Sequence, residues 1–297
     1  MRHSPPCAVR RDRPARPLVR SLISSLACAG LALTALGPAP VAAAVTTRTG
    51  ASVPAAHLEA AAITLEDPVK KEIAMRLVSS AENSTLDWEA QYGYIEDIGD
   101  GRGYTAGIIG FCSGTGDMLD LVELYTARAP RNVLAGYLPA LRAVDGTDSH
   151  EGLDPGFTGD WAEAATDPVF RRAQDDERDR VYFGPAVRQA VNDGLGVLGQ
   201  FIYYDALVMH GGGSDPTSFG AIRRTALEHA RSPSRGGGET AYLDAFLDAR
   251  VWAMRQEEAH SDTSRVDTAQ RVFLREGNLD LDPPLVWQVY GDSYRIG

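Results

Sequence analysis

Apolar side chains recur at helical spacing directly after the acid–proline pair Asp67-Pro68. The apolar positions Val69, Ile73 and Leu77 follow one another at intervals of four residues, so they share one face of a helix. Proline suits the first helical position, where its missing N–H group leaves no hydrogen bond unmade. The pattern predicts a helix that begins after Asp67, runs for about four turns and ends at Glu82.

A second pattern follows, in which side chains alternate as they do along a β-strand. Tyr92, Tyr94, Glu96 and Ile98 would point by turns to opposite faces. Residues 100–103, with the sequence DGRG, are the strongest turn signal in the chain, and residues 104–111 can form the returning strand. We expect one hairpin here, and no other segment shows a comparable strand signal.

Beyond the hairpin the hydrophobic pattern is helical. Residues 195–209 are apolar on nearly all sides, which is typical of a helix buried at the centre of a fold. A charge-rich helix is expected after Asp167-Pro168, and others over residues 117–125, with Thr115 as a possible cap, and over residues 132–141, 219–230, 240–258 and 266–274. The sequence therefore predicts a mainly α protein with one small sheet, as one large domain or two lobes that share a cleft.

The first 44 residues differ in composition from the rest. Six arginines precede an apolar run over residues 22–36, and residues 42–44 (AAA) fit a cleavage site for a secretory signal. The apolar run is short for a membrane span. We expect residues 1–44 to be removed during export, residues 45–65 to form a flexible entry segment, and residues 66–297 to fold. The processed protein would be extracellular, without a membrane anchor.

Charge and cysteine content narrow the function further. Removing residues 1–44 would take away six of 29 basic and one of 40 acidic residues, which leaves a net charge of −16. Such a chain is a poor partner for nucleic acid and attracts a cationic polymer, although many secreted proteins are acidic for solubility alone. Cys112 would be the only remaining cysteine, so no intramolecular disulfide can form and stability must come from the hydrophobic core. We expect the protein to be a monomer.

Two carboxylates have positions suited to catalysis: Glu82 at a predicted helix end and Asp100 at the start of the turn. Glycoside hydrolysis uses one carboxylic acid to protonate the leaving oxygen and a second carboxylate to activate water or attack the sugar. A helix end and a hairpin turn could present such groups across a cleft. The chain lacks the common zinc-protease, serine-hydrolase and phosphate-loop motifs, and we expect neither a metal nor a cofactor.

A third acid, Asp205, lies inside the apolar stretch predicted to be buried. A buried carboxylate without a partner is costly, so a positive side chain should meet it. Arg250 and Arg265 are the best placed candidates. Such a chain of ion pairs could end on a catalytic carboxylate, or it could be purely structural.

At these positions the chain resembles glycoside hydrolase family 46, chitosanases secreted by actinobacteria and bacilli. The likeness covers the chain from about residue 65, and its most specific stretches are residues 78–84 (VSSAENS), 111–117 (FCSGTGD), 203–206 (YYDA), 246–250 (FLDAR) and 262–267 (DTSRVD). The resemblance implies a lysozyme-like, mainly helical, two-lobed catalytic domain over residues 66–297. It also implies endo-hydrolysis of the β-1,4 bonds of chitosan with inversion at the anomeric carbon.

The resemblance also implies roles for individual residues. By position, Glu82 would be the general acid, Asp100 the general base, and Thr105 a residue that helps to hold the attacking water. The network behind the acid would consist of Asp205, Arg250 and Arg265. The residues that match cleft-lining positions are Tyr94, Arg102, Asp117 and Glu257.

Two other functions remain possible from the sequence. A muramidase or chitinase would suit the helix and hairpin, but it would leave the strong acidity without a task. A non-catalytic polysaccharide-binding protein would keep the cleft without turnover.

Overall fold

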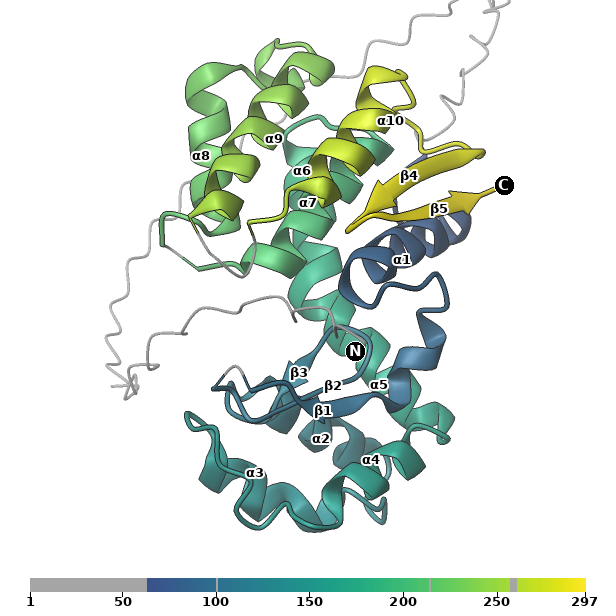
Figure 1. Cartoon of the computed structure of the whole chain (residues 1–297), viewed down its shortest axis with the longest axis vertical. Coiled ribbons are helices and arrows are strands. Elements are labelled where there is room, and N and C mark those ends of the chain that lie inside the picture. Colours follow the sequence, from purple (N-terminus) through teal and green to yellow (C-terminus); the bar gives the residue numbers. More distant parts are fainter. Residues whose placement is uncertain (1–62, 100, 214, 257–260) are drawn as a thin grey trace, which may run out of the picture. The chain divides into compact units, whose positions relative to one another are not determined.

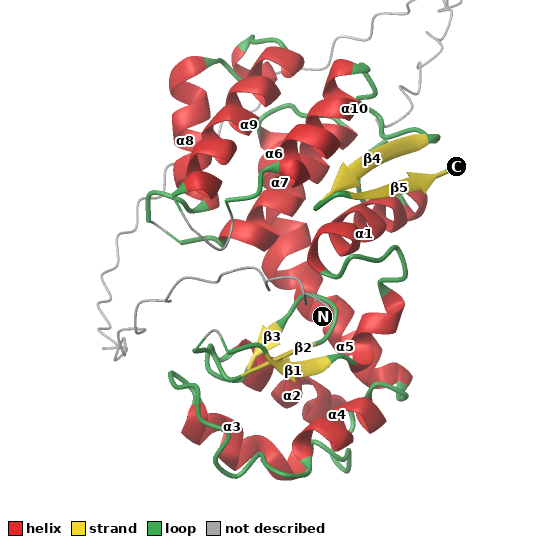
Figure 2. Ribbon diagram, viewed as in Figure 1, coloured by secondary structure: helices red, strands yellow, loops and turns green. Residues whose placement is uncertain are grey.

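Helices make up most of the fold in the computed structural model, which describes residues 63–99, 101–213, 215–256 and 261–297 (Figure 2). The α-helices are α1 (Pro68–Glu82), α2 (Asp117–Arg128), α3 (Leu138–Val144), α4 (Phe157–Ala164), α5 (Pro168–Arg178), α6 (Gly184–Asn192), α7 (Val197–His210), α8 (Phe219–His229), α9 (Glu239–Arg255) and α10 (Arg271–Arg275). Short 3₁₀-helical turns cover Glu89–Gly93, Ala135–Tyr137 and Pro233–Arg235, and π-helical turns cover Asp179–Phe183 and Val266–Gln270.

The helix α1 begins and ends as the sequence predicted. The Asp67 side chain accepts hydrogen bonds from the backbone N–H groups of Val69 and Lys70, which would otherwise lack partners at the helix start. Ile73 and Leu77 of the predicted apolar face are buried, whereas Val69, in the first turn, is 65% exposed. Glu82 is therefore the last residue of a helix whose start is capped and whose inner face is buried.

The first sheet is a three-stranded antiparallel meander of β1 (Ile95–Asp97), β2 (Tyr104–Ala106) and β3 (Phe111–Cys112). It differs from the predicted hairpin in two ways. Tyr92 lies in a 3₁₀ turn, because its carbonyl oxygen accepts hydrogen bonds from Trp161 on α4 and Gln174 on α5 instead of joining a strand ladder. The returning strand stops at Ala106, since the chain turns through Gly107 and Gly110, both at positive φ, to start β3.

A second sheet corrects the expectation of a single one. The strands β4 (Leu285–Val289) and β5 (Asp292–Ile296) form an antiparallel hairpin in which Leu285, Trp287 and Val289 point inward. The period of two is present in the sequence, but the turn lacks the Asn-Gly or Asp-Gly pair that marks hairpins.

The helix α7 is buried along its whole length, which confirms the prediction for residues 195–209. Residues 63–297 belong to one compact unit, in which Figure 1 shows two groups of elements. The sheet lobe contains β1 to β3 and α2 to α5. The helical lobe contains α1, α6 to α10 and the C-terminal hairpin.

The folded chain begins slightly before the predicted boundary. Leu65, expected at the end of the flexible segment, is fully buried, and its N–H group donates a 2.7 Å hydrogen bond to Gln200 Oε1 on α7. The rest of that segment and the signal lie outside the described residues. In the described ranges no helix is both long enough and apolar enough to cross a membrane.

Candidate active site

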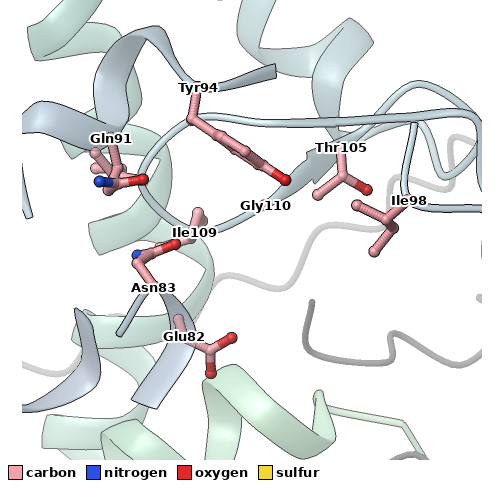
Figure 3. Close-up of a pocket in the computed structure, with 10 residues that line it drawn as sticks. Glu82, Asn83, Gln91, Tyr94, Ile98, Thr105, Ile109 and Gly110 are labelled. Atoms are coloured by element: carbon pink, nitrogen blue, oxygen red, sulfur yellow. The ribbon is translucent and has the colours of Figure 1, made fainter. Parts of the chain in front are cut away.

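A cavity of about 120 Å³ lies between the end of α1 and the first sheet. Figure 3 shows Glu82 and Asn83 on one side of it, with Tyr94, Ile98 and Thr105 facing them. The residues that line the cavity are Glu82, Asn83, Gln91, Tyr94, Ile98, Thr105, Gly107, Ile108, Ile109 and Gly110. The helix end and the sheet that were predicted to face each other therefore share one cavity.

Glu82 forms an ion pair with Arg265. Arg265 Nη1 donates a hydrogen bond of 2.5 Å to Glu82 Oε1, and the two side chains are 4% and 9% exposed. The two residues are 183 positions apart in the sequence. This contact fixes one carboxylate oxygen, while the residue as a whole still lines the cavity.

The predicted partners of Asp205 are confirmed by the geometry. Arg250 Nη1 lies 2.6 Å from Asp205 Oδ2, and Arg265 approaches the same carboxylate with Nε at 2.9 Å and Nη2 at 2.7 Å from Oδ1. Gln270 completes the network, because its amide donates to Asp205 Oδ2 at 2.7 Å and accepts from Arg250 Nη1 at 3.0 Å. The chain of contacts ends on Glu82, as the sequence had suggested it could.

The charges in this network stabilise one another away from water. Burial alone would raise the pKa of Asp205, but Arg265 and Arg250 outweigh it and lower that pKa to about 2. Burial works against the charge of Arg265, yet Asp205 and Glu82 raise its pKa above the usual value. For Arg250 burial prevails, so its pKa is lowered despite Asp205. The aspartate is therefore ionised at neutral pH and paired with two guanidinium groups.

Gln270 was missed by the sequence analysis. An uncharged amide near the end of a helix has no unique partner that its residue type would predict. Gln270 lies five residues after Arg265. The π-helical turn that ends at Gln270 places its amide beside the carboxylate of Asp205.

Thr105 lies in β2, is 2% exposed and lines the cavity opposite Glu82. Its hydroxyl is 3.5 Å from Cys112 Sγ, on the neighbouring strand in register. The structure thus brings Thr105 and Glu82 to the same cavity. Asp100 and Glu257, the predicted base and a predicted cleft residue, lie outside the described residues.

Of the three other described residues predicted to line the cleft, one lines the cavity and two do not. Tyr94 lines the cavity, and its hydroxyl donates to Glu96 Oε2 at 3.2 Å. Arg102 and Asp117 are not among the lining residues, so their contact with substrate stays a prediction. Asp117 is buried and accepts hydrogen bonds from Cys112 N and Thr115 Oγ1, which ties the start of α2 to β3.

Two details of the helix start differ from expectation. The residue that caps α2 is Gly116, in a left-handed conformation, and Thr115 bonds to the Asp117 side chain instead.

No group of three or more His, Cys, Asp or Glu residues within the described ranges could hold a metal ion.

The chain is similar to known glycoside hydrolases along most of its length. The model of the family described as glycosyl hydrolase family 46 matches residues 76–285. A chitosanase from Streptomyces sp. (strain N174) is 71% identical over 232 residues, which cover 78% of this chain and 84% of that protein. A chitosanase from Nocardioides sp. (strain N106) is 63% identical over 271 residues, 90% of this chain and 97% of that protein.

The solved structures to which the chain is similar are also chitosanases. The structure of chitosanase OU01 with substrate has a TM-score of 0.77 and 62% identity, and the match covers 80% of this chain and 100% of that one. These similarities confirm the mainly α, lysozyme-like fold class. The chain therefore belongs to glycosyl hydrolase family 46.

Proposed function

We propose that the protein, a glycoside hydrolase by its family, is an endo-acting chitosanase that cleaves β-1,4 bonds between glucosamine units with inversion of the anomeric carbon. The observation that carries the proposal is the position of Glu82, which lines the cavity while Arg265 holds its Oε1 atom. The relatives named above are chitosanases, and one was solved with substrate.

In the proposed mechanism Glu82 is the general acid. It donates its proton to the glycosidic oxygen as the bond to the anomeric carbon breaks, and Asp100 takes a proton from the water that attacks the opposite face. Because Arg265 occupies Oε1, we assign proton donation to Oε2. Thr105, on the facing wall, suits a residue that orients this water. Exchange with solvent then returns the proton to Glu82 and removes it from Asp100.

The test follows a glucosamine hexamer by proton NMR in the wild type and in Glu82→Gln. The wild type should release the α anomer first, because inversion at a β bond yields α. Glu82→Gln should lose more than about 1,000-fold in kcat, since an amide cannot supply the proton, yet it should still bind the hexamer in calorimetry. Glu228→Gln, an exposed carboxylate on α8 changed in the same way, should behave like the wild type.

Three results would contradict parts of the proposal. Early release of the β anomer would mean retention. Full activity of Glu82→Gln would remove the assignment of the acid. Equal release of reducing ends from chitosan and from chitin or peptidoglycan would favour the muramidase or chitinase alternative, and binding by a wild type that never cleaves would favour a binding protein.

We further propose that residues 1–44 direct export, so that the enzyme acts outside the cell as a monomer. The arginine-rich start, the apolar run and the AAA sequence at residues 42–44 support this assignment. Mass analysis of the protein recovered from the culture medium of its host would locate the mature N-terminus.

A further inference from the structure

A buried thiol lies next to Thr105 in the wall of the cavity. Cys112 is a free cysteine without exposed surface, and it is paired with Thr105 across β2 and β3. We infer that Cys112 is a positioning residue: it takes up the hydroxyl hydrogen of Thr105, so that Thr105 accepts a hydrogen from the attacking water. The inference rests on the proposed function, because it takes Thr105 as the residue that orients this water and Asp100 as the base.

The register of the sheet brings the two side chains to the same face. Thr105 and Cys112 are direct partners in the antiparallel pair of β2 and β3, and opposite residues in such a pair point to the same side. The distance between Thr105 Oγ1 and Cys112 Sγ is 3.5 Å, which allows a hydrogen bond to sulfur. Because Thr105 is 2% exposed and lines the cavity (Figure 3), its hydroxyl must be satisfied by the sheet and by what enters the cavity.

The direction of this hydrogen bond follows from a second contact of the sulfur. Cys112 Sγ donates to the carbonyl oxygen of Gly110 at 3.4 Å. A thiol carries one hydrogen and a carbonyl oxygen can only accept, so the thiol hydrogen is used on Gly110. The sulfur can then meet Thr105 only as an acceptor, and the hydroxyl hydrogen of Thr105 points to Cys112. The hydrogen bonds therefore run in one direction, from Thr105 through Cys112 to Gly110.

The other degrees of freedom of the two residues are restricted. Thr105 is β-branched and lies in a strand, which limits rotation about its Cα–Cβ bond. The N–H group of Cys112 donates to Asp117 Oδ1 at 3.1 Å, so the backbone that carries the thiol is fixed as well. Rotation of the hydroxyl hydrogen is the freedom that remains. The thiol removes it, and the lone pairs of Thr105 Oγ1 are left for the cavity.

A hydrogen-bond acceptor at this point suits the chemistry of the attacking water. In the proposed mechanism the water gives one hydrogen to Asp100 and uses a lone pair to attack the anomeric carbon. A hydroxyl that donated to the water would occupy a lone pair and weaken the nucleophile. A hydroxyl that accepts the second hydrogen leaves the lone pairs free and helps to aim them at the sugar. Cys112 thus affects the reaction through Thr105 without touching the water.

The experiment is a double-mutant cycle of Cys112→Ala and Thr105→Val, with kcat and KM measured on a glucosamine hexamer. Cys112→Ala alone should lower kcat about 5-fold to 20-fold with KM nearly unchanged, because the hydroxyl can then turn its hydrogen toward the water. Thr105→Val should also be slower than the wild type. In that background, which has no hydroxyl to orient, Cys112→Ala should change kcat by less than about twofold. Cys112→Ser can both accept and donate, so it should recover most of the rate.

Val122→Ala is the matched control for lost packing, because it truncates a fully buried residue of α2. It should lower the Tm but keep the wild-type kcat at a temperature where it is folded. If Cys112→Ala does not fold, Cys112→Val takes its place in the cycle, since valine fills the space without a hydrogen-bonding group.

An equal loss of rate in both backgrounds would overturn the proposal, because the thiol would then support the sheet and not the hydroxyl. Three other results would overturn it as well: a Cys112→Ala variant with kcat within about twofold of the wild type, a Cys112→Ser variant as slow as Cys112→Ala, or a Thr105→Val variant with the wild-type kcat. Failure of the proposed function looks different, because then the wild type would not cleave the hexamer or Glu82→Gln would remain active.

Discussion

Asp205 shows how a single buried charge can organise the carboxylate that we propose as the general acid. Its carboxylate accepts hydrogen bonds from Arg250, Arg265 and Gln270, and Arg265 passes the orientation on to Glu82. An ion pair of this kind adds little net stability over an apolar replacement, but losing one partner leaves an uncompensated charge in the core. The network therefore specifies geometry more than it stabilises the fold.

This network predicts a definite dependence of stability on pH. The pKa of Asp205 is lowered from 3.8 to about 2 in the folded protein, so its contribution is complete above pH 4 and is lost as pH falls toward 2. Asp205→Asn should be less stable by about 3–5 kcal/mol at pH 7, because two guanidinium groups lose their carboxylate. The difference from the wild type should narrow by about 2 kcal/mol on going from pH 5 to pH 2.

Urea unfolding at a series of pH values measures this effect. Asp280→Asn, which changes an exposed aspartate, serves as the matched control and should follow the wild-type curve. A gap between Asp205→Asn and the wild type that stays constant with pH would contradict the linkage.

The residue-level predictions succeeded where burial forces a pairing. An aspartate inside an apolar helix requires a cation, and the chain offers few arginines in buried helical segments, so Arg250 and Arg265 could be named. Gln270 could not be, since an amide accepts many partners. The catalytic roles of Glu82 and Thr105 remain predictions, because geometry places them at one cavity without showing the reaction.

Among the elements, the turn that joins β2 to β3 shapes the cavity wall through a close backbone approach. The N–H group of Gly107 donates to the carbonyl oxygen of Tyr94 at 2.8 Å, and a Cβ atom on Gly107 would overlap the buried side chain of Gln174. Gln174 in turn bonds to Ile108 N at 3.2 Å and to the carbonyl oxygen of Tyr92 at 3.0 Å. Glycine is required here for space as well as for its positive φ of 74°.

A comparison of Gly107→Ala with Gly236→Ala separates these two requirements. Gly236 also has positive φ, at 79°, but a Cβ atom there would meet nothing within 4 Å. Both variants should lose about 1–2 kcal/mol of stability from the left-handed backbone. Gly107→Ala should lose a further ~1–3 kcal/mol through overpacking, and its kcat should fall because the cavity wall shifts. Urea unfolding and hexamer hydrolysis give both quantities.

Equal destabilisation of the two variants would show that Gln174 can move aside freely. Gly236→Ala should keep the wild-type kcat, because Gly236 ends a 3₁₀ turn that contributes no residue to the cavity lining. A loss of rate in that variant would point to a general effect of backbone strain.

Elements with strong local signals were predictable and elements defined by tertiary contacts were not. The sequence pattern alone predicts the capped start of α1 and the buried, apolar helix α7. The strand expected at Tyr92 gave way to a 3₁₀ turn whose carbonyl oxygen bonds to Trp161 and Gln174. The C-terminal hairpin was missed, since its turn at Tyr290 runs against the residue preferences by which such turns are recognised.

For the molecule as a whole, charge is the property that most directly concerns the substrate. The full chain carries a net charge of −11, and glucosamine units are cationic when their amines are protonated. Long-range attraction raises the encounter rate and is screened by salt. The value of kcat/KM for a glucosamine hexamer should therefore fall, by about tenfold from low to high ionic strength, while kcat stays nearly constant.

Initial rates across a sodium chloride series would measure this dependence. A short, soluble hexamer avoids the changes in polymer conformation that salt causes in chitosan itself. If kcat/KM is independent of salt, the acidity of the chain serves solubility alone.

The separation between Glu82 and Arg265 has a consequence for how the enzyme comes into being. Glu82 is made early in synthesis, whereas Arg265 follows 183 residues later and Trp287, which bonds to Ser80, follows that serine by 207. A chain still bound to the ribosome thus holds Glu82 without the partners that orient it. Contacts between such distant segments also form slowly. Hydrolytic activity should consequently appear only after the last strand has emerged from the ribosome, so the unfinished chain is inactive.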